Sequence, residues 1–298
     1  MIDRRRVAAS FGAASERYDA AARLQATTRA ELISRLDHFT LSPRVVVDLG
    51  AGTGAGAAAL ARRFPDAQVI AIDISAGMLR VAGERLGWRD RIFGGRFGHP
   101  FARIVGDARA LPLASGSVDL IFSNFMLQWC DDLDATLVEL RRVAAPRALL
   151  MASTFGATTL QELRMAFAAV DATPHVNDFI DMHDLGAALV RAGFEEPVLD
   201  VDRHRETYPD VRSVMRSLKE IGARNAHVAR SRGLFGRGRL RALEEAYARA
   251  ANGEHHLPVT WEVIHASCFA TEVREVRDAD EVVVPLTRIG RRNTAGEA

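Results

Sequence analysis

The sequence predicts an α/β fold built on a doubly wound, mostly parallel seven-stranded sheet with helical insertions that form a lid. Three observations indicate this class. From residue 45 onward, short apolar runs alternate with segments of helical spacing. The runs are apolar at both alternating positions, as expected for strands that are covered on both faces. A glycine-rich turn directly follows the first run, which is typical of the first strand–helix junction in such sheets.

Five strand-like runs predict the central part of the sheet. Each is short, rich in branched residues and separated from the next by a helical or turn segment. They are expected at residues 44–49, 67–73, 102–107, 118–124 and 147–154. Strands that alternate with helices in this way favour a parallel sheet.

After residue 154 the pattern changes. Two helices, a sixth strand, a wholly helical stretch and a seventh strand are expected in that order, over residues 159–170, 182–194, 196–208, 208–258 and 260–273. We expect the helical insertions to cover the carboxyl ends of the strands. The chain then divides into an amino-terminal helical lid, an α/β core, a helical insertion and the final strand with a tail, at residues 1–40, 41–207, 208–258 and 259–298.

Composition limits the class of partner and compartment. The chain has 298 residues, 48% of them hydrophobic, and its 39 basic and 38 acidic residues give a net charge of +1. A charged partner must therefore recognise a local patch. Cys130 and Cys268 lack the spacing of a zinc site or a disulfide framework, which predicts thiols in or near the core, no metal and a reducing compartment. No long apolar run or signal-like segment is present, so we expect a cytoplasmic protein without a membrane partner.

The stretch VVVDLGAGTGAGAAAL at residues 45–60 combines a glycine-rich turn with an acidic residue, Asp48, at the strand end. Such a turn lets a ligand approach the backbone, and the pattern Gly50, Gly52 and Ala55 alone also fits a dinucleotide fingerprint. The carboxylate of Asp48 would repel a pyrophosphate but attract an ammonium group. S-adenosylmethionine carries an ammonium group, a sulfonium cation and no phosphate, so the sequence favours this cofactor.

Acidic residues also end the second and third predicted strands. We expect Asp48 and the turn at Gly50, Gly52 and Gly54 to receive the methionine end of the cofactor. Asp73 would accept both ribose hydroxyls, because a carboxylate offers two acceptor oxygens. Asp107 would accept the adenine amino group beside the amide of Ala108. The alternative for each acid is that it merely ends a strand or caps a helix.

Several further stretches carry a resemblance to a known family. They are SFGAASERYDAAARLQ before the core, SNFMLQWCDDLDATLVELRRV after the fourth strand, and, further on, STFGATTLQELRMAFAAVD, HVNDFIDMHDLGAALVRAGF, YPDVRSVMRSLKEIGARN and LPVTWEVIHASCFA. From Val7 to about Ala270 the sequence resembles class I S-adenosylmethionine-dependent methyltransferases, and among them the malonyl-[acyl-carrier protein] O-methyltransferases of biotin biosynthesis. A long segment at residues 87–103 departs from the family pattern and is expected to be a variable surface loop.

The resemblance implies a Rossmann-like fold and methylation of the free carboxylate of a malonyl thioester, which lets fatty-acid enzymes elongate it toward pimelate. It also implies the cofactor roles given above for the glycine turn and the strand-end acids. Asn124 would lie in the active site. Phe11 and Tyr18 match the amino-terminal lid, where Tyr18 would reach the cofactor or the acyl group.

A carboxylate acceptor needs little help to react. Its unperturbed pKa is near ~4, so it is already ionised at neutral pH and requires no general base. We expect soft donors near the reacting oxygen, from Tyr18, Asn124 or Gln128, because a tight arginine fork would weaken the nucleophile. Trp129 and Phe155 are either walls for the thioester arm or core residues. His175 either lines the acyl pocket or, like His183 and His204, is structural.

An acidic carrier protein would need a basic docking face. Between Gly222 and Leu243 the chain holds six arginines and no acid, namely Arg224, Arg230, Arg232, Arg237, Arg239 and Arg241. Docking through Arg230, Arg232, Arg237 and Arg239 is one interpretation, and a solvated helix face or a phosphate-binding stripe is the other. Nucleic acid is not expected, because interleaved aromatic residues are missing. Rival functions are methylation of another small molecule or of a partner protein, and a non-enzymatic assembly factor.

Overall fold

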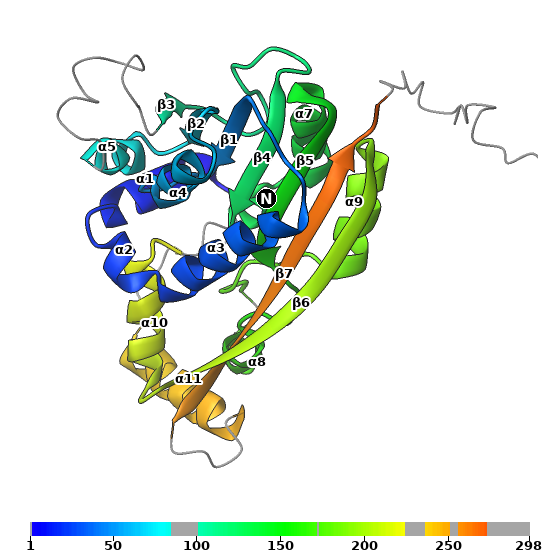
Figure 1. The fold of residues 1–298 in the computed structure, drawn as a ribbon. Helices are drawn as coiled ribbons and strands as arrows, with labels where there is room; N and C mark the ends of the chain where they lie inside the picture. Colours follow the sequence, from blue (N-terminus) through cyan, green and yellow to red (C-terminus); the bar gives the residue numbers. More distant parts are fainter. Residues whose placement is uncertain (1, 85–100, 172, 224–235, 251–255, 273–298) are drawn as a thin grey trace, which may run out of the picture.

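The computed structural model describes residues 2–84, 101–171, 173–223, 236–250 and 256–272, except for the side chains of residues 237 and 250. It contains one seven-stranded sheet in the order β3-β2-β1-β4-β5-β7-β6 (Figure 1). The strands are β1 (Val45–Leu49), β2 (Gln68–Asp73), β3 (Ala102–Val105), β4 (Val118–Asn124), β5 (Ala144–Phe155), β6 (Phe194–Tyr208) and β7 (Leu257–Ala270). All neighbours pair in parallel except β7, which is antiparallel to both β5 and β6. The predicted fold class is confirmed.

Helices cover both faces of this sheet (Figure 1). They are α1 (Arg4–Ala14), α2 (Tyr18–Ala21), α3 (Arg23–Arg35), α4 (Ala55–Arg63), α5 (Ala76–Glu84), α7 (Leu133–Val143), α8 (Gln161–Ala168), α9 (Met182–Arg191), α10 (Val211–Glu220) and α11 (Arg237–Ala250), with short 3-10 turns η1 (Leu36–His38) and η2 (Leu127–Trp129). Aspartates begin four of them, because the side chains of Asp3, Asp132, Asp181 and Asp210 accept backbone amides of the first turn.

Alternate strand residues enter two separate hydrophobic clusters. Val47 and Ile121 join α7 and α9 on one face, whereas Val46 and Leu120 join α3, α4 and α5 on the other. Successive side chains of a strand point to opposite faces. The continuous apolar runs in the sequence are therefore explained by burial on both sides.

A third cluster lies at the carboxyl end of β5 and the amino end of β7, where it joins α8, α10 and α11 (Figure 1). Its aromatic centre is Phe155, whose ring centroid lies 4.4 Å from that of Phe125 and 5.2 Å from that of Trp261. Tyr247 of α11 is fully buried and donates its hydroxyl to the carbonyl of Pro258 at 2.8 Å. The helical insertion thus packs on the end of the sheet through an apolar core of its own.

The predicted lid at residues 1–40 is not one unit. Leu32 and Leu36 have no exposed surface and pack with residues of β1, β4 and β5. This four-residue spacing places both side chains on the same face of the helical segment, toward the sheet. Helix α3 is therefore part of the core, and only α1 and α2 lie over the cleft described below.

No helix in the described ranges has the length and apolar composition needed to cross a membrane. Both cysteines are free thiols; Cys268 is buried and Cys130 is half-buried. This agrees with the expectation of thiols in or near the core.

Replacing Leu32 by Ala should lower the free energy of unfolding by about 2–5 kcal/mol, because it opens a cavity between α3 and the sheet. Urea denaturation would measure the change. Met165→Ala is the matched control, since Met165 is 56% exposed on α8 and should change stability by less than about 0.5 kcal/mol. Equal losses in both variants would contradict the assignment of α3 to the core.

Candidate active site

A cleft opens at the carboxyl ends of the central strands, where the strand order reverses between β1 and β4. Parallel sheets bind ligands at such a position. Its walls come from the turn after β1, the ends of β2 and β4, the loop after β3, and α1 and α2. The predicted residues that line it are Phe11, Tyr18, Gly50, Gly52, Asp73, Asp107, Ala108, Asn124 and Trp129. Residues far apart in the sequence thus meet at one cleft.

The glycine turn brings the backbone to the edge of the cleft. Gly50 has φ +74°, and a Cβ there would lie 2.5 Å from the Cβ of Met126. Gly52 has φ +53° with nothing within 4 Å of a Cβ position, so its surface is open. Gly54 caps α4 and packs against Ala82 and Phe101, outside the cleft-lining set. Two of the three predicted glycines therefore face the cleft.

Three amides of this turn donate hydrogen bonds within the protein. Those of Gly50 and Ala51 donate to the carbonyl of Ile72 at 2.8 and 3.0 Å, and that of Gly52 donates to Asp73 Oδ2 at 2.9 Å. The end of β2 thus accepts the hydrogen bonds of these three amides. The turn therefore offers a ligand close approach to the backbone, and these amides are not available as donors to it.

Asp73 lies at the centre of this arrangement. It accepts the Gly52 amide on Oδ2 and the Ser75 amide on Oδ1, at 2.9 and 2.7 Å. Burial raises its pKa, and the two amides oppose that shift. Each carboxylate oxygen keeps one further acceptor position, and Asp73 lines the cleft, which suits a pair of hydroxyls.

Asp107 is more heavily engaged than the sequence suggested. Arg4 donates to Oδ2 at 2.6 Å, and Arg109 donates through its backbone amide, Nε and Nη2 at 3.1, 3.3 and 3.2 Å. A carboxylate has about four acceptor positions, so none is left for an adenine amino group in this structure. Arg4 was missed by sequence reasoning, although Arg4, Val7 and Phe11 share the helical spacing of one face and all line the cleft.

Asp48 lies behind the glycine turn and is not among the cleft-lining residues. It is 2% exposed, and in the described part of the chain its Oδ2 has no hydrogen-bond partner. Burial raises the pKa of this carboxyl to about 7, while the Ala57 amide and Arg29 lower it and Asp73 raises it. Contact between Asp48 and a ligand ammonium group stays a prediction.

Three aromatic residues close the amino-terminal side. The ring of Phe11 lies edge-on to Trp129 at 5.2 Å and near Tyr18 at 6.2 Å between centroids. No described residue hydrogen-bonds the Tyr18 hydroxyl. Burial and nearby Asp73 raise the pKa of Tyr18 well above its usual range. Tyr18 therefore stays protonated at neutral pH and offers a donor to whatever enters.

The two amides expected near the reaction differ in position. Asn124 lines the cleft, donating from Nδ2 to the Gln25 carbonyl at 3.0 Å and accepting from Ser153 at 2.9 Å. Gln128 lines a neighbouring hollow. Its Nε2 donates to the Phe125 carbonyl at 2.7 Å, and its Oε1 accepts from the Thr154 hydroxyl at 3.2 Å. The structure does not bring Gln128 to the cleft, because its side chain holds the loop around η2.

Two predicted substrate residues also lie elsewhere. Phe155 is 5% exposed and belongs to the aromatic centre of the third cluster. His175 stacks on Phe167 with 4.0 Å between centroids, and its Nε2 lies 2.9 Å from Asp171. These contacts fit the core and structural alternatives that the sequence left open.

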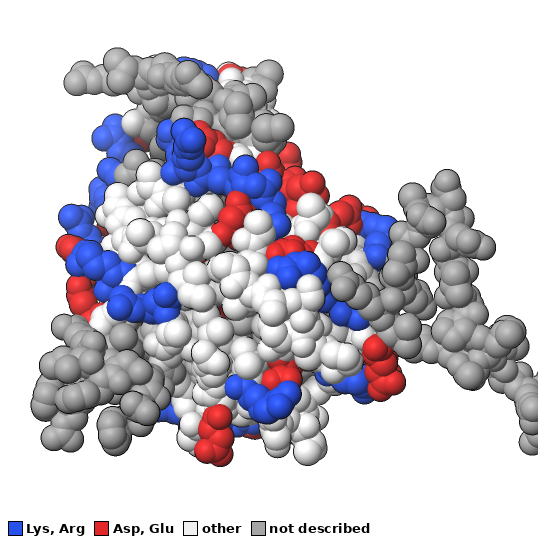
Figure 2. Space-filling view, turned by 90° about the horizontal axis from the view of Figure 1, so that it is seen from above, with Lys and Arg blue, Asp and Glu red and all other residues white. Residues whose placement is uncertain are grey.

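The arginine stretch is described only in part. Arg224, Arg230 and Arg232 lie outside the described residues, as does the side chain of Arg237. Arg239 donates to Asp171, and Arg241 pairs with Glu245. On the face at the amino ends of the parallel strands, basic and acidic side chains are interspersed (Figure 2). A basic docking face on the helical insertion stays a prediction.

Comparison with known proteins identifies the family. Residues 47–152 match the family model described as a methyltransferase domain. The malonyl-[acyl-carrier protein] O-methyltransferase of Gallionella capsiferriformans is 42% identical over 95% of this chain and 96% of its own. That of a Methylovorus species is 45% identical over 92% and 91%.

Solved structures support the fold. The YcgJ protein of Bacillus subtilis matches with a TM-score of 0.57 at 14% identity, over 81% of this chain and 98% of that one. A putative methyltransferase from Bacillus halodurans matches with a TM-score of 0.56 at 16% identity, over 82% and 99%. The chain belongs to the malonyl-[acyl-carrier protein] O-methyltransferase family, on the Rossmann-like fold of class I methyltransferases that use S-adenosylmethionine.

Proposed function

We propose that this protein transfers a methyl group from S-adenosylmethionine to the free carboxylate of a malonyl group carried on acyl-carrier protein. The product would be the malonyl methyl ester that primes pimelate synthesis for biotin. The observation that carries this proposal is the near full-length similarity to relatives of that name, at 42% and 45% identity. The chemistry of the cleft supports it in three respects.

The cleft fits the cofactor. S-adenosylmethionine, when bound, supplies a methyl carbon made electrophilic by a sulfonium group. Asp73 has acceptor positions left for ribose hydroxyls, and the open surface at Gly52 allows close approach to the backbone. The unpartnered Asp48 oxygen behind the turn supplies negative charge near a cationic ligand.

The described residues that line the cleft include no histidine, the usual general base near neutral pH. Tyr18 is held protonated, and burial raises the pKa of the Cys130 thiol to about 11. A hydroxyl acceptor would need such a base, whereas a carboxylate with a pKa near ~4 is already ionised. The acceptor that suits this cleft is therefore a carboxylate.

Positioning is left to neutral groups. The Tyr18 hydroxyl is a single neutral donor, and Asn124 is held in place by Gln25 and Ser153. Arg4 and Arg109 both donate to Asp107, so neither presents a guanidinium fork devoted to the acceptor. An acceptor oxygen that is held without strong charge pairing keeps its nucleophilic character. Phe11 and Trp129 would exclude water from the same region.

The purified chain should transfer labelled methyl groups to malonyl-carrier protein but not to acetyl-carrier protein, which lacks the free carboxylate. Alkaline release of the label as methanol would identify an ester. Equal labelling of both carriers would contradict carboxylate methylation. Binding of S-adenosylmethionine without transfer to malonyl-carrier protein would favour methylation of another acceptor or a non-enzymatic role.

Arg4→Gln should raise the affinity for S-adenosylmethionine by up to about fivefold, because a half-exposed ion pair worth about 0–1 kcal/mol no longer competes for Asp107. Isothermal titration calorimetry would measure the change. Arg5→Gln is the matched control, since Arg5 is an exposed neighbour on the same helix. Weaker binding by Arg4→Gln alone would instead mean that Arg4 contacts the cofactor.

Asp48→Asn should stabilise the ligand-free protein at pH 8 but not near pH 4. The folded pKa of about 7 exceeds the ordinary value of 3.8, so the wild type loses stability as pH rises between these values. The difference between variant and wild type should grow over this window to at most a few kcal/mol, on the order of 1.4 kcal/mol per pKa unit. Urea denaturation at both pH values would measure it, and a difference independent of pH would contradict the burial of an ionisable Asp48.

A further inference from the structure

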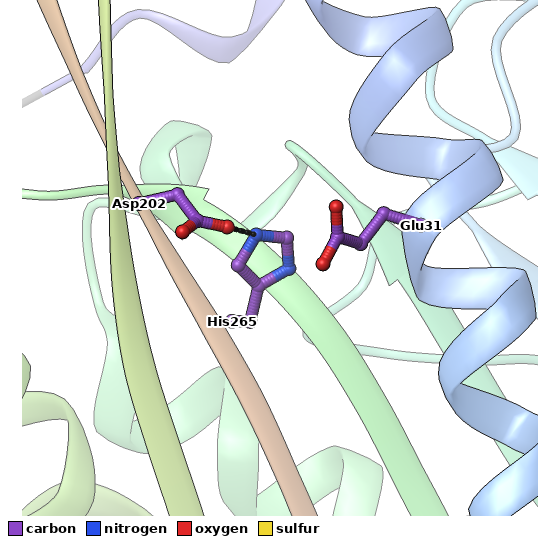
Figure 3. A group of neighbouring side chains, drawn as sticks. All are labelled: Glu31, Asp202 and His265. Atoms are coloured by element: carbon purple, nitrogen blue, oxygen red, sulfur yellow. Dashed lines mark ion pairs between the residues drawn. The ribbon is translucent and has the colours of Figure 1, made fainter.

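A second polar cluster lies outside the cleft-lining set, between α3 and the strand pair β6–β7. Glu31 projects from α3, Asp202 from β6 and His265 from β7 (Figure 3). One atom of each residue that could bind a metal lies within 4.8 Å of those of the other two. None of the three lines the methyl-transfer cleft.

His265 is the buried member of this cluster. Its residue surface is 2% exposed, and its Nε2 lies 3.2 Å from Asp202 Oδ2. Because a carboxylate only accepts, Nε2 carries the ring hydrogen and Nδ1 is left with a lone pair. Nδ1 is buried and has no hydrogen-bond partner in the described chain. Figure 3 shows this edge of the ring turned toward the Glu31 carboxylate.

Two electron-rich groups thus face one another across a short gap. A lone pair on a buried imidazole nitrogen costs free energy when it is left without a partner. A carboxylate oxygen cannot satisfy it, because both atoms are acceptors. The arrangement calls for a positive centre between Nδ1 and Glu31.

The surrounding charges define that centre further. Arg35 donates to Glu31 Oε1 at 2.9 Å and to both oxygens of Asp200 at 2.5 and 2.7 Å. Three carboxylates, those of Glu31, Asp200 and Asp202, therefore face the single guanidinium of Arg35. The net charge of −2 matches a divalent cation.

We propose that this cluster binds one divalent transition-metal ion of the Zn²⁺ class. His265 Nδ1 and the Glu31 carboxylate are the direct ligands, and Asp202 orients the imidazole from its Nε2 edge. Mixed nitrogen and oxygen donors suit Zn²⁺, whereas Mg²⁺ prefers oxygen donors alone. A carboxylate that holds the far nitrogen of a histidine ligand is a common feature of metal sites.

The ion would join α3 to the β6–β7 edge of the molecule. Glu31 lies on the same helix as Gln25, whose carbonyl accepts the hydrogen bond of Asn124 in the cleft. An ion that binds the folded chain and not the unfolded one stabilises the fold by mass action. The role inferred for this site is therefore structural, in fixing the position of α3.

Titration of the chelator-treated full-length protein with ZnCl₂ tests the site. Calorimetry should show one ion per chain, a dissociation constant in the micromolar range and a rise in melting temperature, with no comparable effect of MgCl₂. Glu31→Gln and His265→Gln should each weaken Zn²⁺ binding at least tenfold. Asp202→Asn, which changes only the residue that orients the imidazole, should weaken it by about tenfold.

Glu245→Gln is the matched control, because Glu245 also forms a four-residue-spaced pair with an arginine on the exposed side of a helix. It should leave Zn²⁺ binding unchanged. Should His265→Gln fail to fold, Glu31→Gln still tests the proposal, because the Glu31 side chain is 44% exposed and its replacement should not prevent folding. Absence of saturable binding in the wild type would overturn the proposal, and so would equal binding by Glu31→Gln. A pH-dependent stability that Zn²⁺ does not alter would show that a proton fills the gap, which also overturns it.

Discussion

The cleft depends on one set of backbone contacts, between the end of β2 and the turn after β1. The Ile72 carbonyl and the Asp73 carboxylate accept the amides of Gly50, Ala51 and Gly52. These bonds hold the turn in a left-handed path that a side chain at Gly50 would block against Met126. Because Asp73 also lines the cleft, the residue that fixes the turn is the one that we propose to bind the ribose.

The same region concentrates buried ionisable groups. Asp48 and Tyr18 both have raised pKa values caused mainly by burial, and Asp73 contributes to both shifts. Arg29 opposes both, so the charge of each group depends on the others. An unpaired buried carboxylate is costly in the free protein, and the proposed cationic ligand would recover part of that cost on binding.

Local sequence patterns predicted the strands well, because burial on both faces leaves apolar residues such as Val46 and Val47 side by side. Strand-end positions also brought Asp73 and Asn124 to the cleft. The contacts that these patterns did not predict form only in the folded chain. The pairing of Arg4 with Asp107 joins residues 103 positions apart, and no periodicity encodes it. Gln128 follows β4 closely in the sequence, but its side-chain amide forms hydrogen bonds with Phe125 and Thr154 and does not reach the cleft.

Helix α3 shows why these distant contacts matter for function. Sequence position alone places it with the lid, but its apolar face is buried against the sheet through Leu32 and Leu36. Its polar positions then act in two directions: the Gln25 carbonyl holds Asn124 at the cleft, while Arg35 binds Asp200 on the outermost strand of the sheet. Through these two contacts, α3 links the β6 edge of the sheet to a residue that lines the cleft. The position of the Asn124 side chain therefore rests partly on a helix that is also held at the far edge of the sheet.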